Sequence, residues 1–207
     1  MVSAPADPAL TVPPALPVEF YARSADAVAP ELLGKLLMVR RDGELRLGRI
    51  VECEAYLGEA DLACHAARGL TPRTRTLYGP AGTAYVYLIY GMYELFNAVC
   101  QPEGVPHAVL VRAVELSAAP AGVRGDGPGR LTRALGITRA DNASHLHAPP
   151  VSIHDAPAVT AVTVTPRVGV AYAGVWADAP LRFLDGASGR VSKPPAANVG
   201  SGAQRRS

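Results

Sequence analysis

The chain has 207 residues, of which 49% are hydrophobic and 18% are charged, and its formal net charge is +2. This length supports one domain with a sizeable core, or at most two small ones, and the composition excludes a chain that is disordered throughout. Because the charge balance is nearly neutral, any contact with nucleic acid has to come from a local basic patch.

The two ends of the chain differ in composition from its middle. Residues 1–17 are rich in Ala and Pro, and residues 187–207 are rich in Gly, Ser, Pro and Arg. We expect both to be flexible arms around one folded domain at 18–186. Three cysteines are too few for a disulfide scaffold, so a reduced, cytoplasmic location is expected, and no apolar run is long enough to span a membrane.

The predicted elements begin with a helix at 24–36, with Ser24 as its N-cap. Asp42 and Gly43 indicate a tight turn that joins two strands, the second of which includes residues 50–57. The other expected elements, in chain order, are strands at 83–90 and 107–115, a short helix at 131–135, and short strands at 159–164, 168–170 and 181–184. Strands outnumber helices and are joined mainly by turns, which predicts an α+β fold: a single compact domain around an antiparallel or mixed sheet with flanking helices.

The strand at 50–57 has an unusual distribution of side chains. A period of two places Ile50, Glu52, Glu54 and Tyr56 on one face and Val51, Cys53, Ala55 and Leu57 on the other. The second face is typical of a core, whereas the first carries two carboxylates. A carboxylate beside an aromatic ring suits a general base, although an exposed face that pairs with arginines fits the pattern as well.

Arg112 stands in an otherwise apolar strand, 109–114, and such an arginine needs a carboxylate partner. Glu54 is the natural candidate, and the pair is either catalytic or purely structural.

Four of the eight tyrosines, Tyr85, Tyr87, Tyr90 and Tyr93, fall within nine residues around Gly91. Aromatic side chains at the end of a strand suit stacking on bases or insertion into a duplex. Tyrosines also form strands well, so these side chains equally fit a core with hydroxyls at its rim.

Several loop residues are further candidates for ligand contacts. His65 either donates to a ligand or satisfies a backbone carbonyl. The loop arginines, among them Arg73, Arg75 and Arg130, either neutralise phosphates or are simply solvated. No zinc-ligand spacing and no phosphate-binding loop occur, so we expect neither a metal nor a cofactor.

Two other functional classes remain open at this level. A zinc-dependent base deaminase would need H-x-E and P-C-x-x-C motifs, and neither occurs. A non-catalytic nucleic-acid-binding module would use the same tyrosines and arginines, and only the pairing of Glu54 with Arg112 argues against it.

Long stretches of the sequence resemble the alkyladenine (3-methyladenine) DNA glycosylase family of mammals and bacteria. The match covers residues 18–183, and its most specific strings are Glu-Ala-Tyr-Leu-Gly at 54–58 and Tyr-Val-Tyr-Leu-Ile-Tyr-Gly-Met-Tyr at 85–93. The other matching stretches are 48–53, 63–68 with 71–73, Asn97, 109–115, 127–131, 166–170, and Trp176 with 180–183. The departures are small: Cys53 stands where Thr is common, Ala84 precedes the tyrosines, and the segment 117–124 is short.

The resemblance implies a repair enzyme that flips alkylated or deaminated purines out of duplex DNA and that has no helix-hairpin-helix. We expect a monomeric bacterial protein that is associated with the nucleoid. It implies that Glu54 activates a water molecule that is also held by Arg112 and the main-chain carbonyl of Val168. The other implied roles are a base pocket of Tyr56, His65, Tyr87 and Asn97, intercalation by Tyr90, and contacts with the DNA backbone by Arg73, Arg75, Met92 and Arg130.

The few lysines agree with a water-based mechanism. A glycosidic bond can be cut by water or by an enzyme amine, and the only lysines are Lys35, in the predicted helix, and Lys193, in the tail. A carboxylate serves the water route. We therefore expect a monofunctional glycosylase that leaves an abasic site without cutting the strand.

Overall fold

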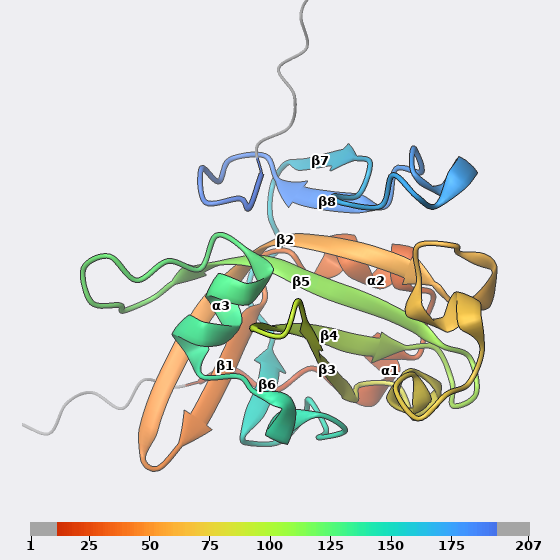
Figure 1. Ribbon diagram of the computed structural model, residues 1–207. Helices are drawn as coiled ribbons and strands as arrows, with labels where there is room; N and C mark the ends of the chain where they lie inside the picture. The colour runs from red at the N-terminus through yellow and green to blue at the C-terminus, as the bar shows by residue number, and fades with distance from the viewer. Residues whose placement is uncertain (1–11, 194–207) are drawn as a thin grey trace, which may run out of the picture.

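Antiparallel pairing joins all eight strands of the computed structural model, which describes residues 12–193 (Figure 1). The order is β3-β4-β5-β2-β1-β6, and β8 pairs with both β2 and β7. The strands are β1 (Leu36–Arg41), β2 (Glu44–Leu57), β3 (Ala84–Ile89), β4 (Tyr93–Cys100), β5 (His107–Leu116), β6 (Val151–His154), β7 (Val162–Thr165) and β8 (Arg182–Asp185). The α-helices are α1 (Val18–Tyr21), α2 (Ala25–Leu32) and α3 (Pro128–Leu135), and the 3₁₀ helices are η1 (Gly58–Ala60), η2 (His65–Arg68), η3 (Arg75–Tyr78), η4 (Arg139–Asp141) and η5 (Gly174–Trp176).

This architecture confirms the predicted α+β class, with a sheet that is antiparallel throughout. One hydrophobic core contains Leu32 of α2, Leu135 of α3 and Phe96 of β4, so the two longer helices cover the same sheet. No helix within residues 12–193 is long and apolar enough to cross a membrane. Residues 1–11 and 194–207, most of the two predicted arms, lie outside the described residues. The prediction of flexible arms was wrong for the described parts, because Leu16 packs in the core and Ser192 bonds to Glu52.

The first hairpin forms as its turn residues predict. Asp42 and Gly43 have φ values of 52° and 81°, the left-handed conformations that a tight hairpin turn requires. The helix prediction was right at its start and wrong at its end: Ser24 is the N-cap of α2, but the helix stops at Leu32. The chain turns at Gly34 (φ 88°), where a Cβ would lie 2.4 Å from the carbonyl oxygen of Pro157, so Leu36 already belongs to β1.

Two strands were not predicted and one predicted strand does not form. β4 and β6 were missed, and β7 begins three residues later than expected. Residues 168–170 form a turn at Gly169 (φ 78°) because the Val168 amide bonds to the Glu54 side chain, not to a strand.

An irregularity in β2 shapes the site. Ile50 pairs with Val114, Glu52 with Ala113 and Cys53 with Val111, so Val51 is an extra residue in β2 and Arg112 is passed over in β5. The predicted alternation therefore holds from Glu52 to Tyr56 but was wrong at Ile50, which joins Cys53 in the core. Such bulges redirect side chains, and this one places the carboxylates of Glu52 and Glu54 beside Arg112.

Candidate active site

A cavity of about 450 Å³ lies where β2, β3, β4 and β5 meet the start of α3 and the turn at 168–170. Of the side chains expected at the site, those that line it are Tyr56, His65, Tyr87, Tyr90, Asn97, Arg112, Arg130 and Val168. Glu54 lies behind this wall and bonds to three of its members, Tyr56, Arg112 and Val168. Residues far apart in the sequence thus come together around one cavity, which Arg73, Arg75 and Met92 do not line.

Glu54 is fully buried, and the three hydrogen bonds to its carboxylate come from groups at the cavity wall. The Val168 amide donates to Oε1 at 2.7 Å, the Tyr56 hydroxyl donates to Oε2 at 2.9 Å, and Arg112 Nη1 lies 3.3 Å from Oε2. Burial raises the pKa of the Glu54 carboxyl, while Arg112, the Val168 amide and the Tyr56 hydroxyl oppose that rise. A carboxylate in such surroundings is a base whose strength is increased by its environment.

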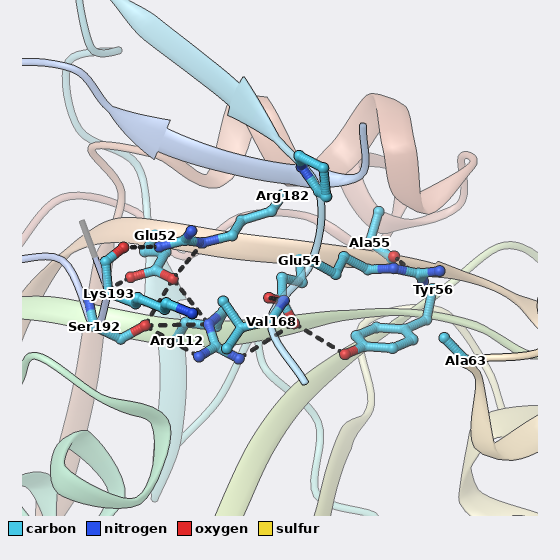
Figure 2. A network of polar contacts seen from close by, with 12 residues as sticks. Glu52, Glu54, Ala55, Tyr56, Ala63, Arg112, Val168, Arg182, Ser192 and Lys193 are labelled. Carbon is cyan, nitrogen blue, oxygen red and sulfur yellow. Dashed lines mark hydrogen bonds and ion pairs between the residues drawn. The ribbon is translucent and has the colours of Figure 1, made fainter. Parts of the chain in front are cut away.

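Arg112 lies between two carboxylates (Figure 2). Its Nε is 2.8 Å from Glu52 Oε1, closer than its Nη1 is to Glu54, so Glu54 is a partner of Arg112 but not the nearer one. Glu52 is also fully buried and accepts from Arg182 Nε at 2.8 Å. Two glutamates and two arginines therefore form a compact cluster whose formal charges cancel.

The aromatic wall of the cavity is built from β2, β3 and η2. The rings of His65 and Tyr87 are 4.5 Å apart, and Tyr85 and Tyr87 are 5.2 Å apart. His65 Nδ1 lies 3.0 Å from the Tyr85 hydroxyl. Burial, aided by Arg73 and Arg68, lowers the pKa of His65 to about 4, so its imidazole is neutral at physiological pH.

Asn97 is buried at the base of the cavity in β4. Its side-chain amide donates to the Tyr85 carbonyl at 3.0 Å, which fixes its orientation. The rigid placement suits a residue that limits what fits in the cavity.

Tyr90 stands at the tip of the β3–β4 hairpin and is 82% exposed. Its φ of 52° is unusual for a tyrosine, and with Gly91 (φ 69°) it forms the turn that the Met92 amide closes on the Ile89 carbonyl. Met92 beside it is 68% exposed. Because the side chain of Tyr90 is exposed at the rim of the cavity, Tyr90 is not a core residue.

Two of the predicted backbone-contact residues are solvent-exposed arginines on the segment 71–78. Arg73 lies over the Tyr87 ring at 5.6 Å, and Arg75 begins η3. Arg130 is in the first turn of α3 and pairs with Asp126 at 3.2 Å. The start of α3 packs closely on the hairpin, because a Cβ at Gly129 would lie 2.9 Å from the Tyr93 ring.

The sequence analysis missed one buried ion pair that supports the site. Arg167 and Asp61 are both fully buried and make two hydrogen bonds, at 2.5 and 2.8 Å. Asp61 also accepts from the Leu57 and Ala63 amides, and Arg167 lies 4.7 Å over the Tyr56 ring. The pair fastens the turn that carries Val168 to the segment that leads to His65. An arginine next to Val168 in a matching stretch was the only signal.

Within the described part of the chain, no three His, Cys, Asp or Glu side chains are grouped closely enough to hold a metal ion.

A family model described as methylpurine-DNA glycosylase (MPG) matches residues 19–188. The chain belongs to the methylpurine-DNA glycosylase family. It is therefore a hydrolase that acts in DNA repair on alkylated purines.

Similar proteins from bacteria and an archaeon support this assignment, each named "Putative 3-methyladenine DNA glycosylase". The Myxococcus xanthus protein is 56% identical over 183 residues, covering 87% of this chain and 94% of the relative. The Legionella pneumophila (strain Lens) protein is 51% identical over 171 residues, covering 81% and 92%. The Methanocella arvoryzae protein is 45% identical over 193 residues, covering 87% and 96%.

Proposed function

We propose that this glycosylase extrudes a damaged purine nucleotide from duplex DNA and hydrolyses its N-glycosidic bond with water activated by Glu54. The observation that carries the proposal is the fully buried carboxylate of Glu54 bonded to three groups at the wall of an aromatic cavity. Burying a carboxylate costs several kcal/mol, so a pure binding module would gain nothing from this arrangement.

The aromatic wall suits an alkylated base. Tyr56 and Tyr87 stack on the extruded purine, and His65 completes the pocket. Because the imidazole of His65 is neutral at physiological pH, it does not repel a cationic base such as a methylated purine. Asn97 crowds the position of the 2-amino group of guanine and thereby disfavours the normal base.

The β3–β4 hairpin and three arginines contact the DNA duplex. Tyr90 enters the minor groove and takes the place of the flipped nucleotide, with Met92 beside it, and this offsets part of the cost of unstacking. Arg73, Arg75 and Arg130 contact phosphates around the extruded nucleotide. The protein acts as a monomer.

Chemistry at the sugar uses Glu54 in two ways. Its carboxylate takes a proton from the attacking water and offsets the positive charge that develops on the sugar in an oxocarbenium-like transition state. Arg112 and the Val168 amide keep the carboxylate oriented, and the Val168 carbonyl holds the same water. None of the residues that line the cavity is a lysine, which supports a monofunctional reaction.

Incubation with methylated DNA tests the proposal. We expect free methylated purine to be released and abasic sites to remain in strands that break only after alkaline treatment. Strand cleavage without alkali would contradict the monofunctional mechanism, and binding of the DNA without any release would favour a binding module.

A further inference from the structure

The segment that follows β8 returns to the cluster of Glu52, Glu54, Arg112 and Arg182, and Figure 2 shows Ser192 and Lys193 beside it. The Ser192 amide donates to Glu52 Oε2 at 2.5 Å, and the Ser192 hydroxyl donates to Glu52 Oε1 at 2.8 Å. The Lys193 carbonyl accepts a hydrogen bond from Arg182 Nη2. The segment is thus attached to both the carboxylate and the guanidinium groups of the cluster.

The hydroxyl of Ser192 also bonds to Arg112. Nη2 of Arg112 lies 3.1 Å and Nε lies 3.3 Å from Ser192 Oγ. A hydroxyl has one donor and two acceptor sites, so these contacts are compatible with donation to Glu52. With Nε and Nη2 engaged in this way, Nη1 is the nitrogen that meets Glu54.

We propose that Ser192 is a positioning residue for base release: it closes the cluster and holds Arg112 in the orientation that places Nη1 against the Glu54 carboxylate. Ser192 touches neither the cavity nor Glu54, so it acts only through Arg112 and Glu52. Without its hydroxyl, water enters the space, Nη2 of Arg112 loses its partner, and the longer contact of Nη1 with Glu54 loosens. The consequence for base release rests on the proposed function, whereas the effect on Glu54 is a property of the free protein.

The charged and titratable groups around Glu54 define what a loss of Ser192 changes. They are Glu52 and Tyr56 on β2, Cys53 at the adjacent position, Arg112 on β5, Tyr87 on β3, Arg167 before the Val168 turn, and Arg182 opposite on β8. Of these, Arg112 is the cation that most opposes the rise in the pKa of Glu54. Loosening Arg112 should therefore raise that pKa further.

A carboxyl titration of the free, full-length protein by ¹³C NMR tests this without any substrate. The Glu54 signal is assigned by its absence from a Glu54→Gln variant. We expect Ser192→Ala to raise the pKa of Glu54 by about one unit, on the scale of losing one hydrogen bond to a charged group. Ser192→Thr keeps the hydroxyl and should restore the original titration, and Ser192→Cys serves as a second variant if the alanine protein does not fold.

Ser188→Ala is the matched control. Ser188 lies in the same segment as Ser192, and its hydroxyl donates to Glu115 at 2.6 Å. It makes no contact with Glu52 or Arg112. We expect its Glu54 titration to equal that of the wild type. An unchanged titration in Ser192→Ala, or equal titrations in the alanine and threonine variants, would overturn the proposal.

Single-turnover base release adds the functional readout. Ser192→Ala should lower the rate at neutral pH about ten-fold and move the acidic limb of the pH profile upward, with lesion affinity unchanged. If the pKa of Glu54 rises in Ser192→Ala but the wild-type protein releases no purine, the proposed function is overturned and the positioning of Arg112 by Ser192 stands. A shifted titration with a wild-type rate and pH profile would overturn the role in base release.

Discussion

Glu52 and Glu54 are two residues apart, share a strand face and are both fully buried, yet their surroundings give them different roles. Glu54 bonds to the groups of the cavity wall, whereas Glu52 is held by Arg112, Arg182 and Ser192. The sequence predicted the shared face of Glu52 and Glu54 and a carboxylate partner for Arg112. It could not predict that Arg182 and Ser192 bond to Glu52, because they lie 130 and 140 residues further along the chain.

The two glutamates should differ in what they do for stability. Removing one partner from a buried ion cluster leaves an uncompensated charge, so we expect Glu52→Gln to lower the free energy of unfolding by about 3 kcal/mol. Glu54→Gln should lower it by less, since burial raises the pKa of Glu54 and makes its ionised form less favourable in the folded state. Urea unfolding of both variants measures the difference, and equal losses would contradict these roles.

The pH dependence of catalysis follows from the same residue. The pKa of Glu54 is raised above its ordinary 4.5, and the base must be ionised, so the rate should fall as pH drops through that raised value. We expect the acidic limb of the single-turnover profile to lie above pH 4.5 and to disappear in Glu54→Gln. His65, with a pKa of about 4, is already neutral in that pH range and should not add to the fall in rate. A limb that persists in the glutamine variant would assign it to another group.

At the level of elements, the β3–β4 hairpin carries the exposed aromatic tip of the site. The tyrosine run predicted β3 and the turn at Gly91, but it did not reveal β4 as a separate strand, although β4 positions Asn97 and Tyr93. Within β4, Glu94 and Asn97 interrupt the apolar pattern that marks a strand. Their polarity is explained by tertiary bonds, from Asn97 to Tyr85 and from Arg139 to Glu94.

A Tyr90→Ala variant tests the role of the hairpin tip. The side chain is 82% exposed, so the melting temperature should change little. The affinity for duplex DNA with one damaged purine should weaken by about 2 kcal/mol, on the scale of unstacking a base. A large fall in melting temperature with normal affinity would show that Tyr90 is structural.

For the whole molecule, length and composition predicted one folded domain, and the structure is one antiparallel α+β fold. Its net charge is only +2. The fold class followed from strands joined by turns. The sheet order and the bulge in β2 did not, because both depend on pairings between distant segments. Since the net charge is small, we expect DNA binding to depend on local groups such as Arg73, Arg75 and Arg130.

This predicts a moderate salt dependence for binding. The slope of log K against log salt should correspond to about 3 to 6 phosphate contacts. Arg73→Gln should reduce the slope by about one contact, while the exposed Arg40→Gln on β1, which does not line the cavity, should leave it unchanged. A slope near zero in the wild type would mean that DNA phosphates do not contribute to binding.

The central claim is that Glu54 activates the water that releases the base, and the most direct measurement compares Glu54→Gln with wild type in single-turnover release from a duplex carrying one hypoxanthine or ethenoadenine. We expect the rate to fall by about 10²–10⁴-fold while binding of the lesion persists, because stacking and phosphate contacts do not use this carboxylate. Glu103→Gln makes the same chemical change at an exposed position and should retain the full rate. Base release by Glu54→Gln at close to the wild-type rate would contradict the mechanism.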